Sequence, residues 1–290
     1  MWRCIIFVCA AVLALECPSR ASAGVGVDEL VETFVHLSTG REDGTPGAPL
    51  VVRRWERPLS YASIGAPTDQ HEKRVDDHFA FLSTLSRLPI VKSKPLAFNV
   101  DPTTNRSVFV PRTKDYLFSS NFVRNEIERL VYVTVGNKQN IAVYGADLVV
   151  AWLDKESVRF IPPAFSRFGP KAMGDLSEGR ASCACLFLHN PKTQEIDLAV
   201  VFLRFDLDEW LAERCVQEEL TQAMGLMEDI KGSSLTLFND DYSDKRSSLT
   251  EFDKIFVRML YDPRMRSGMT ASEVRAVAKQ IIPEYYENRR

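Results

Sequence analysis

The stretch from Glu218 to Glu228, which reads EELTQAMGLME, decides the fold prediction for this chain. Glu218 and Gln222 are four residues apart, so a helix places both side chains on one face. Gly225 then lets the chain turn, and Glu228 stands three residues beyond it. The spacing predicts a helix, a glycine turn and three polar side chains that the turn brings together.

This frame resembles the H-E-x-x-H-x-x-G-x-x-H motif of metzincin-type zinc metalloproteases. Glu218, Gln222 and Glu228 stand at the three histidine positions, while Gly225 matches the turn glycine and Glu219 the general base. The resemblance implies an α+β, zincin-like fold, with a mixed twisted sheet, an active-site-type helix and C-terminal helices. Because zinc prefers imidazole and thiolate ligands, the motif indicates a degenerate site that holds no zinc.

The predicted elements follow the same order. The strongest strand signals are at 183–188 and 196–205, joined by the turn at 189–191. The motif helix runs from Asp208 through Met227, and a later helix begins at a Thr250/Asp253 start signal. A capping box at Thr270 and Glu273 starts the last helix. The helix that begins at Thr250 ends in the pair Leu260-Tyr261. In this it resembles the C-terminal helix of matrix-type metalloproteases.

A second resemblance covers most of the chain after about residue 50. It rests on Cys215, Glu218–Gln222, Gly225-Leu226, Phe238–Asp241, Leu260–Arg264 and Gly268–Thr270. These residues are similar to the signature of a family of secreted bacterial proteins known only as domain of unknown function 2927. That family implies no activity.

The N-terminus predicts export. Arg3 is followed by an apolar run, and Ala21-Ser22-Ala23 matches a signal-peptidase site, so residues 1–23 are interpreted as a signal peptide. The mature protein is expected in the periplasm or outside the cell. Residues 24–50 are predicted to form a flexible N-terminal extension, and 51–290 a single zincin-like domain with an insertion at about 111–175.

Composition excludes some classes of partner. The chain has 36 Lys and Arg against 39 Asp and Glu, a net charge of −3, so it has no basic field for nucleic acid. No run in the mature chain has the ~20 apolar residues that a membrane-spanning helix needs. We therefore expect neither a nucleic-acid partner nor a transmembrane segment.

Three cysteines, Cys183, Cys185 and Cys215, remain after removal of the signal. In an oxidising compartment they predict one disulfide and one remaining thiol. Cys183 and Cys185 point to the same face of a strand, so either could reach Cys215 on the helix, and the pair Cys185–Cys215 is preferred. The alternative is three buried thiols.

Two functions stay open. The first is a non-catalytic binding or assembly role, in which a vestigial cleft around Glu219 and Gln222 holds a peptide, a glycan or a cell-envelope protein. The second is a peptidase-like hydrolase with Glu219 as general base and non-histidine ligands. A plainer alternative makes Glu218 and Glu219 exposed helix charges.

Other polar residues complete the candidate site. Asp229, Asn239, Asp240 and Asp241 are assigned to the cleft or to turns. Asparagine and aspartate in such a loop most often serve turn chemistry, with calcium binding as the alternative. No metal or other cofactor is expected.

Overall fold

The computed structural model describes residues 25–40, 50–65, 67–93, 146–153, 158, 170–239 and 245–287. They form six helices and one five-stranded mixed sheet, so the chain is an α+β protein, as the sequence predicted. Residues 1–23, the predicted signal peptide, lie outside this part. Among the described residues, no helix is both long enough and apolar enough to cross a membrane.

Four strands of the sheet are parallel, and the fifth is antiparallel at one edge. Their spatial order is β2 (Ile90–Lys92), β1 (Leu59–Gly65), β3 (Leu148–Leu153), β5 (Ile196–Arg204) and β4 (Cys183–His189). The parallel neighbours β1 and β2 are joined by helix α2 (Asp69–Ser86), because parallel strands need a crossover connection. β4 and β5 form the hairpin that the sequence predicted.

The central strand β3 corrects one prediction. All six of its residues are buried, and alternate side chains such as Val150 and Val149 enter hydrophobic clusters on opposite faces of the sheet. A continuous apolar run is typical of a parallel strand that is covered on both sides. Residues 148–153 therefore do not belong to an insertion, and most of the rest of 111–175 lies outside the described part.

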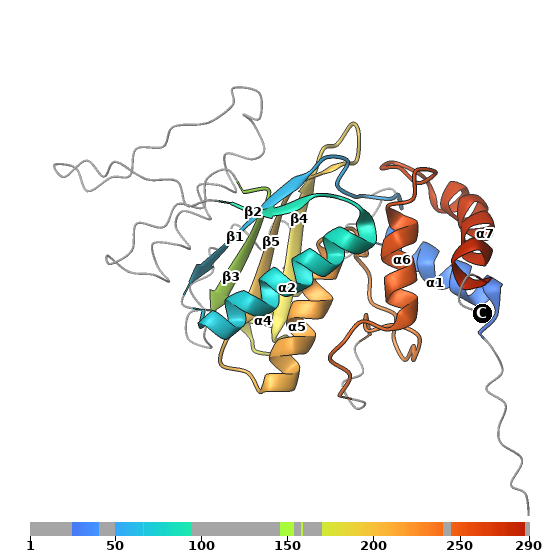
Figure 1. The fold of residues 1–290 in the computed structure, drawn as a ribbon. Coiled ribbons are helices and arrows are strands. Elements are labelled where there is room, and N and C mark those ends of the chain that lie inside the picture. The colour runs from blue at the N-terminus through green and yellow to red at the C-terminus, as the bar shows by residue number, and fades with distance from the viewer. Residues whose placement is uncertain are drawn as a thin grey trace, which may run out of the picture.

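Helices cover both faces of the sheet. α2 and α5 (Glu209–Gln222) lie side by side on one face, as Figure 1 shows, and they contact each other. On the opposite face, α4 (Pro170–Ser177) packs against β4, and its Leu176 joins a cluster with Val200 and Phe202. The motif helix thus packs both on the sheet and against α2.

Three further helices, α1 (Val27–Thr39), α6 (Glu251–Leu260) and α7 (Ala271–Glu287), pack together beside the sheet (Figure 1). Leu30 and Phe34 of α1 are buried, and the rings of Phe34 and Phe256 are 5.8 Å apart. The prediction of a flexible extension over 24–50 is therefore wrong for residues 27–39. An amphipathic helix is stabilised when its apolar face is buried against the apolar faces of neighbouring helices.

The C-terminal helix starts are confirmed. Thr250 and Asp253 form a capping box at the start of α6. At the start of α7, the Thr270 backbone N–H donates to Glu273 Oε2 at 2.8 Å, and the Glu273 N–H donates to Thr270 Oγ1 at 3.4 Å. Both boxes satisfy backbone donors that the first helical turn leaves without a partner.

Candidate functional site

Helix α5 carries the motif, and it turns the polar side chains inward. Glu218, Glu219 and Gln222 are only 4%, 7% and 5% exposed. The interpretation of Glu218 and Glu219 as exposed helix charges is therefore wrong. Buried charged and polar groups are costly unless they are paired, so their partners decide what this cluster does.

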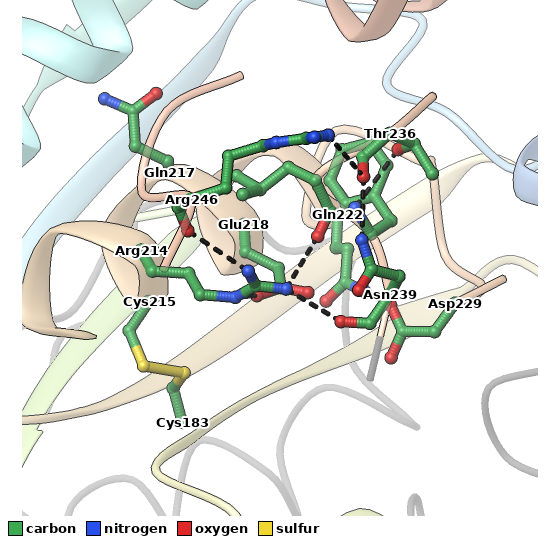
Figure 2. A network of polar contacts seen from close by, with 12 residues as sticks. Cys183, Arg214, Cys215, Gln217, Glu218, Gln222, Asp229, Thr236, Asn239 and Arg246 are labelled. Carbon is green, nitrogen blue, oxygen red and sulfur yellow. Dashed lines mark hydrogen bonds and ion pairs between the residues drawn. A yellow bond between two sulfur atoms is a disulfide. The ribbon is translucent and has the colours of Figure 1, made fainter. Parts of the chain in front are cut away.

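The partner of Glu218 is Arg214, one helical turn earlier. Arg214 is fully buried, and its Nε donates to Glu218 Oε2 at 3.1 Å. Its remaining nitrogens donate to backbone oxygens of the following loop: Nη2 to Leu237 at 2.9 Å and Asn239 at 2.7 Å, and Nη1 to Arg246 at 3.1 Å. Figure 2 shows the guanidinium between the helix and this loop. Glu218 thus pairs with a buried cation that attaches α5 to the backbone at Leu237, Asn239 and Arg246.

Gln222 spans the turn after the helix. Its Nε2 donates to Asp229 Oδ1 at 3.0 Å, and the Asp229 side chain lies at an exposed position. The Asp229 carbonyl lies 3.3 Å from His36 Nε2 of α1. The amide of Gln222 therefore stabilises the return of the chain toward α1.

The turn itself requires glycine. Gly225 has φ +116°, and a Cβ at this position would lie 2.2 Å from the Arg53 carbonyl oxygen. Hydrogen bonds from Trp55 Nε1 to the Ala223 oxygen and from Tyr261 Oη to the Met224 oxygen, both 2.8 Å, hold the turn. The turn predicted at Gly225 is confirmed, and α5 ends at Gln222, earlier than predicted.

Glu228 follows the turn, three residues after Gly225. It packs against the end of α1, where a Cβ added to Gly40 would meet Glu228 Cβ at 2.4 Å. Among the described residues, no three His, Cys, Asp or Glu side chains are grouped so that they could hold a metal ion. The structure therefore places Glu218, Glu219 and Gln222 on one buried helix segment and Glu228 beside Gly40.

The loop after α5 is held by a second buried acid, Asp253. It accepts hydrogen bonds from Thr236 Oγ1 at 2.5 Å, from the Leu237 N–H at 3.0 Å and from the Thr250 N–H at 2.7 Å. Burial raises the pKa of Asp253, and these hydrogen bonds oppose that shift. The acid that caps α6 thereby also fixes the loop that receives Arg214.

Asn239 has a turn role. Its Nδ2 donates to the carbonyls of Thr236 at 2.9 Å and Ser233 at 3.2 Å. Asp240 and Asp241 lie outside the described residues, so the calcium alternative for this loop stays a prediction.

The disulfide differs from the preferred prediction. Cys183 is bonded to Cys215, with 5.8 Å between the Cα atoms, and Cys185 is buried but not part of the bridge. The preference for Cys185 is wrong, although the strand and the helix that are joined are the predicted ones. The bridge fixes α5 to β4 next to Arg214 (Figure 2).

Sequence reasoning missed two residues of this region. Arg214 was readable as a basic residue four positions before Glu218, which is an i,i+4 pair. His78 of α2 is 3% exposed, and its Nε2 lies 2.9 Å from Thr221 Oγ1 on α5. Burial lowers the pKa of His78 to about 3. The signal that could have found it is its spacing of three residues from Val75 and four from Leu82, which corresponds to the apolar face of the helix.

Comparison with known proteins finds one family. The model described as "Protein of unknown function (DUF2927)" matches residues 27–280. No curated protein matches the chain. The match begins at the first residue of α1, which agrees with the packing of that helix in the core. It supports the second resemblance found in the sequence, and the metzincin resemblance has no such support.

Proposed function

Since this chain belongs to the DUF2927 family, whose description gives no activity, we propose its function from the contacts of α5. We propose that it is an exported, non-catalytic binding protein in which the polar residues of α5 stabilise the fold. Its proposed partners are a peptide, a glycan or a protein of the cell envelope. The signal peptide and the periplasmic or extracellular location are part of this proposal.

The ion pair between Arg214 and Glu218 carries the proposal. A carboxylate that pairs with a fully buried guanidinium stabilises that charge where water cannot reach it, and its loss is strongly destabilising. In a catalytic site, by contrast, polar side chains meet the substrate, and their removal often leaves stability unchanged or improved. The contacts of Glu218 favour a structural role.

Stability tests this assignment. Glu218→Gln should lower the free energy of unfolding by roughly 3 kcal/mol, because it breaks the buried ion pair with Arg214. Glu209→Gln is the matched control on the same helix; its side chain is 74% exposed, and the loss should stay within about 1 kcal/mol. Urea denaturation of the mature chain measures both. Equal stability of the Glu218→Gln variant and the parent would contradict the structural role.

The hydrolase alternative predicts that a substitution at Glu219 changes activity and leaves stability unchanged. If Glu219 is a general base, the purified protein hydrolyses fluorescein-labelled casein, and Glu219→Gln abolishes turnover at an unchanged melting temperature. On our proposal the two proteins give the same rate as buffer. Intact-mass analysis of the exported protein tests the remaining part, with Gly24 expected as the first residue.

A further inference from the structure

The carboxyl ends of the parallel strands meet the start of α2. From β1 the chain crosses through α2 to β2 on one side, and β3, on the other side of β1, leads on to β4 and β5. The chain therefore leaves β1 and β3 in opposite directions, and the carboxyl ends of these two strands form a topological switch point, here called the switch-point edge. In open sheets of parallel strands, ligands bind at such points. Figure 1 shows α2 and α5 both beginning near this edge.

Three polar atoms at this edge are buried and lack a hydrogen-bond partner among the described residues. They are Ser63 Oγ on β1, Trp152 Nε1 on β3 and Arg74 Nη1 on α2, here called the switch-point donors. The two strand residues are close, because Ser63 pairs with Val150 and Gly65 with Trp152. Trp152 is only 1% exposed. A buried donor without an acceptor costs about 1–3 kcal/mol, so a molecule that supplies acceptors would be stabilised here.

Of these donors, Trp152 and Ser63 lie under the first turns of α2, which carries Arg74. The indole of Trp152 stacks on the ring of His71, with the centroids 4.7 Å apart and 21° between the planes. Ser63 lies on the face of β1 that α2 covers, since the ring of Tyr61, two residues earlier, is 4.2 Å from that of Phe79. Burial and the nearby charge of Arg74 lower the pKa of His71, which agrees with this proximity.

Charge decides which acceptor fits. Arg74 already forms ion pairs with Glu209 through Nη2 and with Glu213 through Nε, the latter at 3.4 Å. Two carboxylates thus balance one guanidinium, and an incoming oxyanion would be repelled. A neutral carbonyl oxygen accepts the same hydrogen bonds without that repulsion.

Two observations favour a peptide over a glycan. One face of the Trp152 ring is stacked on His71, so this face cannot serve as a platform for a sugar ring, whereas a carbonyl needs only the N–H at the ring edge. Indole and guanidinium N–H groups only donate, which suits carbonyl oxygens better than hydroxyls that also donate. At the rim, Asp69 and Glu209 are exposed carboxylates that can receive the N–H groups of a peptide.

We propose that the switch-point edge binds a peptide segment, whose carbonyl oxygens accept hydrogen bonds from Ser63 Oγ, Trp152 Nε1 and Arg74 Nη1. This inference rests on the proposed function only in taking binding as the role of the chain. It uses none of the residues of the buried network around Arg214 and Glu218.

The indole N–H of Trp152 provides a direct readout. In the mature chain labelled with ¹⁵N at its tryptophan indoles, acetyl-tetraalanine amide should shift the Trp152 resonance saturably, with Trp152→Phe used for assignment. The Trp55 resonance is the internal control, because its Nε1 already donates to the Ala223 oxygen. Inorganic phosphate and chitotriose, tested in parallel, should leave Trp152 unmoved.

Variants separate binding from folding. Ser63→Ala should weaken peptide binding about fivefold at an unchanged melting temperature, because Ser63 Oγ has no hydrogen bond to lose among the described residues. Lys73→Ala is the matched control; this side chain is 73% exposed and pairs with Asp77. It should bind the peptide as the parent does.

Four results would overturn the site: a Trp152 resonance that the peptide does not shift, one that phosphate shifts, one that chitotriose shifts, or unchanged peptide affinity in Ser63→Ala. None of them bears on the non-catalytic role of α5, which is decided by the Glu218→Gln and Glu219→Gln variants. Failure of the two proposals can therefore be told apart.

Discussion

Acidification should destabilise this protein through His78. The imidazole is buried between α2 and α5, and burial lowers its pKa from 6.5 to about 3 in the folded chain. Thr221 Oγ1 donates to the Gln217 oxygen at 2.6 Å, so the hydrogen between Thr221 and His78 comes from Nε2 of a neutral ring. In the unfolded chain the ring takes up a proton at its ordinary pKa.

The sign and the size of this pH effect on the unfolding free energy follow from the linkage between proton binding and folding. A folded pKa below the unfolded one gives a contribution that is complete above pH 6.5 and is lost as the pH falls toward 3. Each pH unit in this window costs about 1.4 kcal/mol, so lowering the pH from 7 to 5 should remove roughly 2 kcal/mol of unfolding free energy. A loss of this size is about two fifths of the stability of a domain that unfolds with ~5 kcal/mol.

Urea denaturation at pH 7, 6 and 5 and constant ionic strength measures the effect. Other groups titrate as well, so the test compares the change of unfolding free energy with pH in the parent and in His78→Gln. The amide of the introduced Gln can still donate to Thr221. The variant should lose about 2 kcal/mol less than the parent between pH 7 and 5. His36→Gln, at an exposed position of α1, is the control and should behave as the parent does. Identical pH dependence in the parent and the His78→Gln variant would refute the reasoning.

Two other substitutions test the turn and the bridge. Gly225→Ala should cost more than about 3 kcal/mol, since it combines a positive φ with a clash against the Arg53 oxygen. Gly179→Ala, with φ +75° and no atom within 4 Å of the added Cβ, isolates the strain of about 1 kcal/mol, and equal losses in denaturation would contradict the clash. Cys215→Ser should lower stability by about 3–4 kcal/mol, because the bridge closes a sequence separation of 32. Peptide mapping without reductant should find Cys185 alkylated, and a Cys185–Cys215 peptide would show the other pairing.

The local elements could be predicted because their signals are local. The hairpin of β4 and β5, the motif helix and the box at Thr250 follow from periodicity and capping residues within a few positions. Which strand cysteine forms the disulfide with Cys215 could not be predicted, because Cys183 and Cys185 share one face of β4. The position of α5 along the strand decides between them, and that position is set by packing of the whole sheet.

Burial of α1 and β3 illustrates the same limit. An amphipathic segment at the N-terminus looks alike whether it packs on α6 and α7 or remains mobile, and only the partner faces decide. The apolar run of β3 did not reveal its central place and was assigned to an insertion, since its neighbours β1 and β5 in the sheet are distant in sequence. For the site, spacing predicted the helix and the turn at Gly225, whereas the pairing of Glu218 needed the loop that receives Arg214.

This pairing changes how the zinc-motif resemblance can be tested. Installing histidines at Glu218, Gln222 and Glu228 would be the obvious way to ask whether the frame can hold zinc. In this structure, however, Glu218→His breaks the buried ion pair with Arg214, at a cost of roughly 3–5 kcal/mol. The variant would lose stability before its geometry could be judged. Replacing Arg214 by Met in the same protein removes that buried charge, at the cost of the Arg214 hydrogen bonds to the Leu237, Asn239 and Arg246 carbonyls. Zinc uptake by the quadruple variant, measured together with its unfolding free energy, would then report on the ligand geometry.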